Sequence, residues 1–376
     1  MSPNLALRKG LSSARRFSVP SWHDAVPVLA VIVLALSWGK ALSPLVVAVV
    51  TIVLAGAVLS AVHHAEVVAL GVGEPFGSLV LAIAVTVIEV ALIVTLMIAG
   101  AGAAETLARD TVFAAVMLTC NGIVGLSILA GTRREPVVAF NAQGADAALA
   151  TVMTLSALSL VVPTFTTSRP GPVFSPGQLA FAAITSLALY GLFVTLQTGR
   201  HRDYFLPVTA DGKAIDAEEH AAPPSTGAAL KSFGLLLVAL VGVVGNAKLV
   251  SPTIERGVAY AGFPPSVVGV IIAMLVLMPE TLAAVRAARR GRMMISLNLA
   301  FGSAMASIGL TIPTIAIASI WLPGPLHLGL GSLHIVLLTV TAIVTTLTVV
   351  PGRATLLQAG IHLALVAAYL FLAISP

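Results

Sequence analysis

Residues 77–99 read GSLVLAIAVTVIEVALIVTLMIA, a stretch long enough to cross a bilayer that carries a single carboxylate, Glu89, near its middle. No lysine or arginine in the stretch neutralises this acid. An ionised carboxylate at membrane depth costs roughly 2.5–3.5 kcal/mol on insertion scales, so its presence predicts a function at a cavity or at a partner group. Residues 267–285, VVGVIIAMLVLMPETLAAV, repeat the arrangement with Glu280. Two lone glutamates in comparable spans indicate one site built twice, although a protonated glutamate bonded inside a helix bundle would explain either one alone.

The composition excludes a soluble protein. Of the 376 residues, 58% are apolar and only 9% are charged, whereas soluble domains carry about 25% charged residues. The single cysteine, Cys120, rules out a disulfide within the chain. The net charge of +5 is better explained by loops on one side of a membrane than by nucleic acid, so no nucleic-acid partner is expected.

Counting roughly 20 apolar residues per span predicts eleven transmembrane helices in an all-α polytopic membrane protein. The predicted spans are residues 25–39, 42–62, 76–99, 111–130, 145–165, 177–198, 230–249, 265–286, 294–317, 329–350 and 355–374. The lipid bilayer is therefore the first expected partner of this chain.

Basic residues predict the orientation, because lysine and arginine accumulate on the cytoplasmic side. With the N-terminus inside, most of the 20 lysines and arginines fall in inner segments. The outer segments hold only Lys40, Arg109, Arg169, Lys248 and Arg256. We therefore expect a multi-pass protein of a bacterial inner (plasma) membrane with a cytoplasmic N-terminus and an external C-terminus.

The chain divides into two halves around a polar linker. We expect a cytoplasmic tail and first transmembrane helix in residues 1–41, a five-helix repeat in 42–198, a cytoplasmic linker in 199–229 and a second five-helix repeat in 230–376. Glu89 and Glu280 each fall in the second helix of their repeat.

Short phrases recur in both halves. Gly73-Glu74-Pro75 precedes the helix of Glu89 much as Gly262-Phe263-Pro264-Pro265 precedes that of Glu280. In each half, the helix after the glutamate-bearing helix ends in a similar segment: VGLSI at 124–128 in the first half and IGLTI at 308–312 in the second. Because five is odd, two such units in series enter the membrane from opposite faces. This is the inverted repeat of secondary transporters, whose substrate site lies near the midplane.

Oxygen ligands for a cation are available near both acids. Pro279 removes one backbone hydrogen bond and frees the carbonyl of Leu275, although an ordinary helix kink is an equal explanation. Thr86 lies one turn before Glu89. Further candidate ligands on the following helices are Thr119, Asn121, Asn298, Ser303 and Ser307. Small polar residues in membrane helices also serve as packing contacts, and this alternative stays open for each of them.

A histidine pair lies at the inner end of the second span. His63 and His64 titrate near neutral pH, so together with Glu66 and Glu74 they are a candidate pH gate; the alternative is a solvated helix end. Their sequence is not H-E-x-x-H, and adjacent histidines point in different directions on a helix. We therefore predict that the chain is not an enzyme.

Three segments resemble one family. Residues 269–314, which include LMPE and GSAMASIGLTIP, residues 73–94 and the TGRHRDYF segment at 198–205 resemble the bacterial calcium/proton and sodium/proton antiporters of the cation/calcium exchanger superfamily, the ChaA type. The resemblance implies ten core helices in two inverted halves, with Glu89 and Glu280 binding the cation or protons, and it places Ser303 and Ser307 in the polar ligand region. The wider superfamily often carries asparagine where this chain has Thr86 and Leu277. This departure argues against a highly coordinated calcium site and leaves sodium or potassium open.

The expected function is cation/proton antiport by alternating access, with calcium, sodium or potassium exchanged for protons at the shared pair Glu89 and Glu280. The alternative is a cation channel that uses the same acids as a selectivity site. Small inorganic cations and protons are the expected substrates, both glutamates are the expected metal ligands, and no cofactor is expected. The oligomeric state stays open, and a homo-oligomer is compatible with the sequence.

Overall fold

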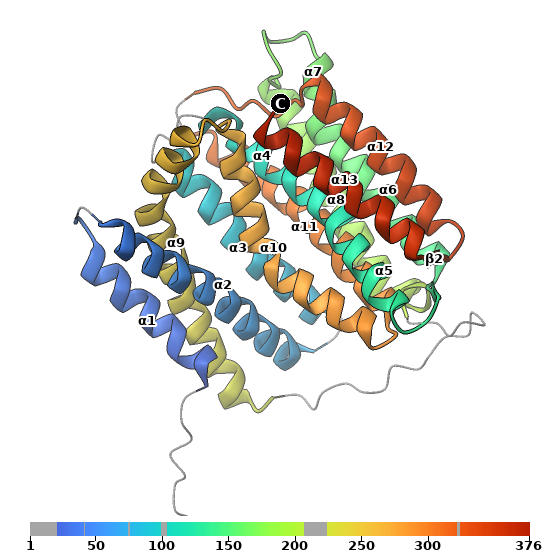
Figure 1. Ribbon diagram of the computed structural model, residues 1–376, viewed down its shortest axis with the longest axis horizontal. Helices are drawn as coiled ribbons and strands as arrows, with labels where there is room; N and C mark the ends of the chain where they lie inside the picture. Colours follow the sequence, from blue (N-terminus) through green and yellow to red (C-terminus); the bar gives the residue numbers. More distant parts are fainter. Residues whose placement is uncertain (1–20, 41, 74–75, 99–103, 207–223, 322–323) are drawn as a thin grey trace, which may run out of the picture.

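The computed structural model describes residues 21–40, 42–73, 76–98, 104–206, 224–321 and 324–376 (Figure 1). Before the linker its helices are α1 (Trp22–Ser37), α2 (Pro44–Val72), α3 (Phe76–Ile98), α4 (Ala104–Met117), η1 (Leu118–Ile123), α5 (Val124–Thr132), α6 (Ala142–Ser156), η2 (Ala157–Val161), α7 (Val162–Phe165), α8 (Pro176–Thr195), η3 (Leu196–Arg200) and η4 (Arg202–Phe205). After it follow α9 (Thr226–Tyr260), α10 (Ser266–Arg289), α11 (Met293–Ala318), α12 (Ser332–Val349) and α13 (Leu356–Ile374).

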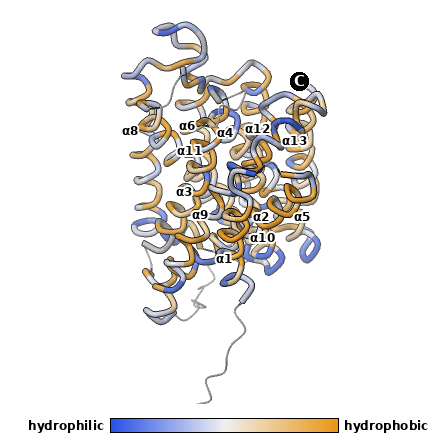
Figure 2. Tube along the Cα trace, turned by 90° about the vertical axis from the view of Figure 1, so that its left-hand side faces the viewer, coloured by the Kyte–Doolittle hydropathy of each residue, from blue (hydrophilic) through white to orange (hydrophobic). Residues whose placement is uncertain are grey.

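In the described part of the chain, 10 helices are long and apolar enough to cross a membrane, and α1 is a shorter apolar helix. Hydrophobic residues mostly cover the middle of these helices, as Figure 2 shows. The all-α polytopic fold class is therefore confirmed. The largest boundary difference is α9, which continues past the predicted end at residue 249 to Tyr260. A hydropathy count leaves out the polar sequence that contains Glu255 and Arg256, whereas backbone hydrogen bonding continues through it.

Local sequence determines where the membrane helices begin. The Ser43 hydroxyl caps α2 by accepting from the backbone N–H of Val46, and Pro44 occupies the first helical position. Ser175 and Gln178 form a reciprocal capping box at the start of α8. Such caps satisfy backbone N–H groups that the first turn of a helix leaves without a partner.

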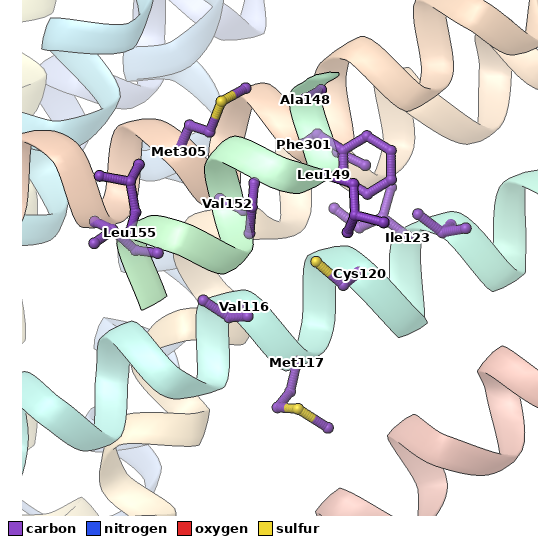
Figure 3. Close-up of a cluster of buried hydrophobic side chains, with 14 of the residues drawn as sticks. Val116, Met117, Cys120, Ile123, Ala148, Leu149, Val152, Leu155, Phe301 and Met305 are labelled. Carbon is purple, nitrogen blue, oxygen red and sulfur yellow. The ribbon is translucent and has the colours of Figure 1, made fainter. Parts of the chain in front are cut away.

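The helices form two groups. α2 and α9 pack along each other and α1 lies against both, so these three form one side of the molecule (Figure 1). α3 and α10 lie between this group and the rest: α3 packs on α2 and α11, and α10 packs on α4 and α11. On the other side α11 packs on α8, and α13 on α5. Figure 3 shows part of the core, where Cys120 of η1, Val152 of α6 and Phe301 of α11 are buried together. The described helices thus pair elements from the two halves of the chain.

The two similar segments, residues 124–128 and 308–312, each use a glycine for close helix packing. A methyl group added at Gly125 would lie 3.0 Å from Leu363 and 3.1 Å from His362 on α13. A methyl group added at Gly309 would lie 2.7 Å from the Cβ of Tyr190 on α8. α5 and α11 therefore each use a glycine to approach closely a helix from the other side of the linker, α13 and α8 respectively.

A small sheet that the sequence analysis did not predict joins two loops at one end of the bundle. Strands β1 (Val137–Ala139) and β2 (Arg353–Thr355) pair antiparallel, with Val138 opposite Ala354. They connect the loop after α5 to the turn between α12 and α13. Three-residue strands carry too little periodicity to be recognised in a sequence.

Candidate functional site

Glu89 and Glu280 line one cavity of about 240 Å³. α3 supplies Glu89 and α10 supplies Glu280, so the two acids come from helices on opposite sides of the linker in the sequence. The remaining walls come from α8 with η3 and from α11. Besides the two acids, the lining side chains that carry oxygen are Thr86, Tyr190, Gln197, Asn298, Ser303 and Ser307. The structure thus brings together two acids that are far apart in the sequence.

Glu89 is buried and has a hydroxyl partner. Its side chain is 5% exposed, and the Ser307 hydroxyl on α11 donates to its Oε1 at 2.5 Å. Thr86 lies one turn earlier on α3 and lines the same cavity. A hydroxyl that donates to a carboxylate stabilises the ionised form, since hydrogen bonds to charged groups are stronger than neutral ones.

Glu280 has a different environment. Its Oε2 is buried and has no hydrogen-bond partner among the described residues. The carboxyl group lies within electrostatic range of Glu66 on α2 and of Glu89. α10 continues as a helix through Pro279, and the Thr281 hydroxyl donates to the carbonyl of Leu277 at 2.7 Å. A buried carboxylate oxygen without a partner fits a group whose partner is a transported ion or proton.

The cavity extends from the acids toward one end of the bundle. Gln197 lies where α8 passes into η3, and Asn298 lies in the first turns of α11. This is also the end at which α10 terminates in Arg286 and Arg289. The distribution of lysine and arginine along the chain predicts that this arginine-rich end is cytoplasmic.

Four of the predicted neutral ligands reach the cavity: Thr86, Asn298, Ser303 and Ser307. Asn298 has a second contact, because its amide nitrogen donates to the carbonyl of Phe205 at 2.8 Å. Phe205 in turn packs edge-on against Phe193, which also lines the cavity. Asn298 therefore holds the η4 segment beside the cavity mouth.

Asn121 and Leu275 do not line this cavity. The amide of Asn121 donates to the Thr341 hydroxyl at 3.0 Å, and its oxygen faces His362 Nδ1 at 3.2 Å. Both partners lie on α12 and α13, away from Glu89 and Glu280. Asn121 falls within the π-helical segment η1, whose wider turn changes the direction of its side chains relative to a regular helix. Leu275 packs against an apolar cluster formed mainly by α2, α3, α9 and α10, so the structure places neither Asn121 nor Leu275 in the cavity of the two acids.

The predicted histidine pair belongs to a larger cluster that includes α1. His64 contacts the Ser232 hydroxyl at 3.3 Å and the carbonyl of His23 at 3.0 Å. The His63 ring stacks on that of His23, with centroids 3.8 Å apart. The participation of α1 was missed, because contacts between distant helices are not readable from one sequence.

The acids of the predicted gate are placed only in part. Glu66 on α2 lies within electrostatic range of Arg286, at the arginine-rich end, and of Glu280. Glu74 lies outside the described residues. Glu66 therefore connects the histidine-bearing helix with the acid pair.

The wall formed by α8 was not predicted from the sequence. Tyr190, Phe193 and Gln197 line the cavity, and Tyr190 is buried. These positions recur at intervals of three and four residues, as expected for one face of a helix. That spacing was the available signal, but α8 contains no charged residue to draw attention to it.

No resident metal centre is formed by the residues described. Among them, no group of three or more His, Cys, Asp or Glu side chains could hold a metal ion. The two acids with hydroxyl neighbours instead suit an ion that binds and leaves.

Comparison with known proteins identifies the family. The family model described as sodium/calcium exchanger protein matches residues 42–199 and 231–375. The protein y4hA of Sinorhizobium fredii is 41% identical over 375 residues, which cover 98% of this chain and 100% of that protein. The sodium-potassium/proton antiporter ChaA of Escherichia coli is 34% identical over 348 residues, which cover 92% of this chain and 93% of ChaA.

Solved structures share the fold. Native YfkE superposes with a TM-score of 0.68 at 17% identity, covering 94% of this chain and 99% of that chain. The H⁺/Ca²⁺ exchanger CAX superposes with a TM-score of 0.67 at 16% identity, covering 93% of this chain and 91% of that chain.

Proposed function

The chain belongs to the sodium/calcium exchanger protein family, and from this premise we propose that it exchanges small inorganic cations for protons across a membrane. Family membership confirms the resemblance found in the sequence and agrees with the prediction of a transporter rather than an enzyme. The ions proposed are sodium, potassium or calcium. The family description names sodium and calcium, and the Escherichia coli relative is named for sodium and potassium.

One observation carries the proposal: Glu89 and Glu280 line the same buried cavity. An ionised carboxylate at membrane depth is costly unless it is compensated, so each acid favours either a bound proton or a bound cation. Competition of the two ligands for the same oxygens couples their movements. A cation that enters must displace protons, and protons that enter must displace the cation.

Alternating access is proposed from the relation between the two halves. We propose that residues 42–198 and 230–376 are inverted five-helix repeats, because Gly125 and Gly309 have equivalent packing in the two halves. In transporters built from inverted repeats, one helix group rocks against the other around a site near the midplane. The cavity extends toward the arginine-rich end, which suits a state open to that side.

The histidine cluster supports a second element of the proposal. We propose that His63 and His64, with Glu66 and Glu74, make exchange depend on pH at the inner side. Histidine is the side chain that titrates near neutral pH, and this cluster lies where α1, α2 and α9 meet. We also propose a bacterial inner membrane location, with the N-terminus in the cytoplasm and the C-terminus outside.

The test is exchange in proteoliposomes that contain the purified full-length protein. An imposed proton gradient should drive uptake of sodium, potassium or calcium, and Glu89→Gln and Glu280→Gln should each abolish this uptake. The amide is an isostere without the charge or the exchangeable proton, so we expect both variants to fold. Glu105→Gln, at a half-exposed acid remote from the cavity, is the matched control. Cation flux that ignores the proton gradient would instead favour a channel.

A further inference from the structure

The two halves do not supply the same ligands to the cavity. Thr86 precedes Glu89 by three residues and Leu277 precedes Glu280 by three, so they occupy equivalent places one turn before each acid. Both line the cavity and both are buried, at 5% and 4% exposure. One half therefore offers a hydroxyl at this place, and the other offers only methyl groups.

The following helices show the same difference. The equivalence of residues 124–128 with 308–312 places Ile123 at the position of Ser307. Ser307 donates its hydroxyl to Glu89, whereas Ile123 is a buried aliphatic residue. A second hydroxyl-donating residue for Glu280 is thus missing from the position where the repeat would put it.

The hydroxyls that the first half does contain are used elsewhere. Ser127, equivalent to Thr311, accepts from Ser296 at 2.6 Å. Thr119, equivalent to Ser303, donates to the carbonyl of Ala115 in its own helix at 2.8 Å. Neither residue lines the cavity. This agrees with the buried Oε2 of Glu280, which has no hydrogen-bond partner among the described residues.

The two amides that line the cavity lie nearer its mouth than Ser307, the hydroxyl partner of Glu89, and that of Asn298 already donates to the carbonyl of Phe205. Asn298 precedes Ser307 by nine residues on α11, which is about 13 Å along a helix. Gln197 follows Tyr190 by seven residues, about 10 Å toward the mouth. Farther from the mouth, the neutral side-chain oxygens of the lining are those of Thr86, Ser303, Ser307 and Tyr190, and Thr311 lies beside the carboxylate of Glu89.

A calcium ion takes six to eight oxygen ligands at about 2.3–2.6 Å, arranged around the whole ion. A ligand set concentrated on the Glu89 side leaves the Glu280 side of such an ion with one carboxylate and an apolar wall. A monovalent ion has less hydration to replace, so the same one-sided set suits it better.

We infer that this site selects a monovalent alkali cation over calcium, and that Leu277 determines the choice by withholding a neutral oxygen from the Glu280 side. The inference rests on the proposed function, since it assumes that the cavity of Glu89 and Glu280 is the transport site. Leu277 is a specificity-determining residue in this account and takes no part in proton exchange.

The experiment compares three cations on the full-length protein in proteoliposomes. The initial rate of proton release is measured against the concentration of sodium, potassium and calcium chloride, each in a separate series. We expect transport efficiency for sodium or potassium to exceed that for calcium at least tenfold. Leu277→Asn, whose side chain has nearly the shape of leucine, should raise the efficiency for calcium at least tenfold.

Leu81→Asn is the matched control, because it puts the same amide into the same cavity on α3, two turns before Glu89. It should leave the ratio of calcium to sodium efficiency unchanged. If Leu277→Asn does not give a monodisperse protein, Leu277→Thr reproduces the hydroxyl found at Thr86 and should shift the same ratio in the same direction.

The outcomes separate the inference from the function on which it rests. Absence of proton-coupled movement of all three cations in the unmodified protein would overturn the proposed function. Calcium exchange within tenfold of sodium and potassium would overturn the inferred selectivity and leave antiport standing. A folded Leu277 variant with an unshifted ratio, or an equal shift in Leu81→Asn, would overturn the role given to Leu277.

Discussion

At the scale of single residues, the hydrogen bond from Ser307 distinguishes Glu89 from Glu280. A hydrogen bond to a charged group contributes roughly 1.5–3 kcal/mol, so its loss makes the ionised form of Glu89 less favourable. We expect Ser307→Ala to raise the cation concentration needed for half-maximal exchange about tenfold or more. Ser296→Ala is the control, because its hydroxyl donates to Ser127 outside the cavity. An unchanged half-maximal concentration in a well-folded Ser307→Ala protein would show that this bond has no role in cation binding.

The histidine cluster gives a second prediction at this scale. The rings of His23, His63 and His64 lie within 5.5 Å of a neighbouring ring, and Asp24 pairs with Lys231 beside them at 3.1 Å. A proton on one ring therefore disfavours a proton on the next. Replacing His63 and His64 together with glutamine should move the pH of half-maximal exchange by a measurable fraction of a unit and leave the maximal rate nearly unchanged.

His201→Gln is the control for that pair, because His201 stacks on Tyr204 and lies outside the cluster. The measurement is the initial exchange rate from pH 5.5 to 8.5. If the double variant and the unmodified protein have the same pH dependence of the exchange rate, His63 and His64 have only a structural role at a helix end.

The residues of the candidate site were predictable to different degrees, for physical reasons. Glu89 and Glu280 were recognisable in the sequence because a charge in an apolar span is costly. Ser307, a predicted ligand from the GSAMASIGLTIP segment, does contact Glu89. Asn121 was misplaced because the π-helical turn of η1 directs it toward His362. No rule of composition or periodicity reveals such a local change of helix geometry in a single sequence.

At the scale of the helices, close approach of α11 to α8 depends on Gly309. A Cβ there would lie 2.7 Å from the Cβ of Tyr190, so the helices must separate to admit even a methyl group. Overpacking of this kind typically costs about 1–3 kcal/mol. We expect Gly309→Ala to lower the thermal midpoint of the purified protein by several degrees.

Gly302→Ala on the same helix is the matched comparison. Nothing lies within 4 Å of a methyl group added at Gly302, so its helix propensity improves without a clash. Its thermal midpoint should stay equal or rise. A fall of equal size in both variants would mean that the glycines act through backbone flexibility and not through helix contact.

The helices were the most predictable level of this structure, because an apolar segment of about 20 residues has the length of a membrane-spanning helix. Their ends were less predictable. α2 continues past His63 and His64 to Val72, and α9 continues past Glu255 to Tyr260, because helical hydrogen bonding does not stop at polar side chains. The partners of each helix were not predictable, since the packing of α13 on α5 joins segments that share no local signal.

At the scale of the whole molecule, the two cavity acids limit the charge moved in each cycle. When protons replace the cation, both Glu89 and Glu280 should end neutral, because an unpaired carboxylate in the membrane during the return step would be costly. Asp110 is also buried, but it pairs with Arg109 at 2.8 Å and does not line the cavity of the two glutamates. Two protons per cycle are therefore the most that the cavity pair can carry.

This limit predicts an electrogenic exchange for a monovalent cation. Two protons against one sodium or potassium ion move one net charge, worth about 2.3 kcal/mol per 100 mV, whereas two protons against one calcium ion move none. Proteoliposomes adsorbed on a solid-supported membrane should give a current in the direction of proton movement when sodium or potassium is added. Glu89→Gln should give none.

Active exchange of a monovalent ion without current would mean one proton per cation, so that one acid stays ionised through the cycle. A current during calcium exchange would require a further titrating acid, and Glu66 is the first to replace because it lies within electrostatic range of Glu280.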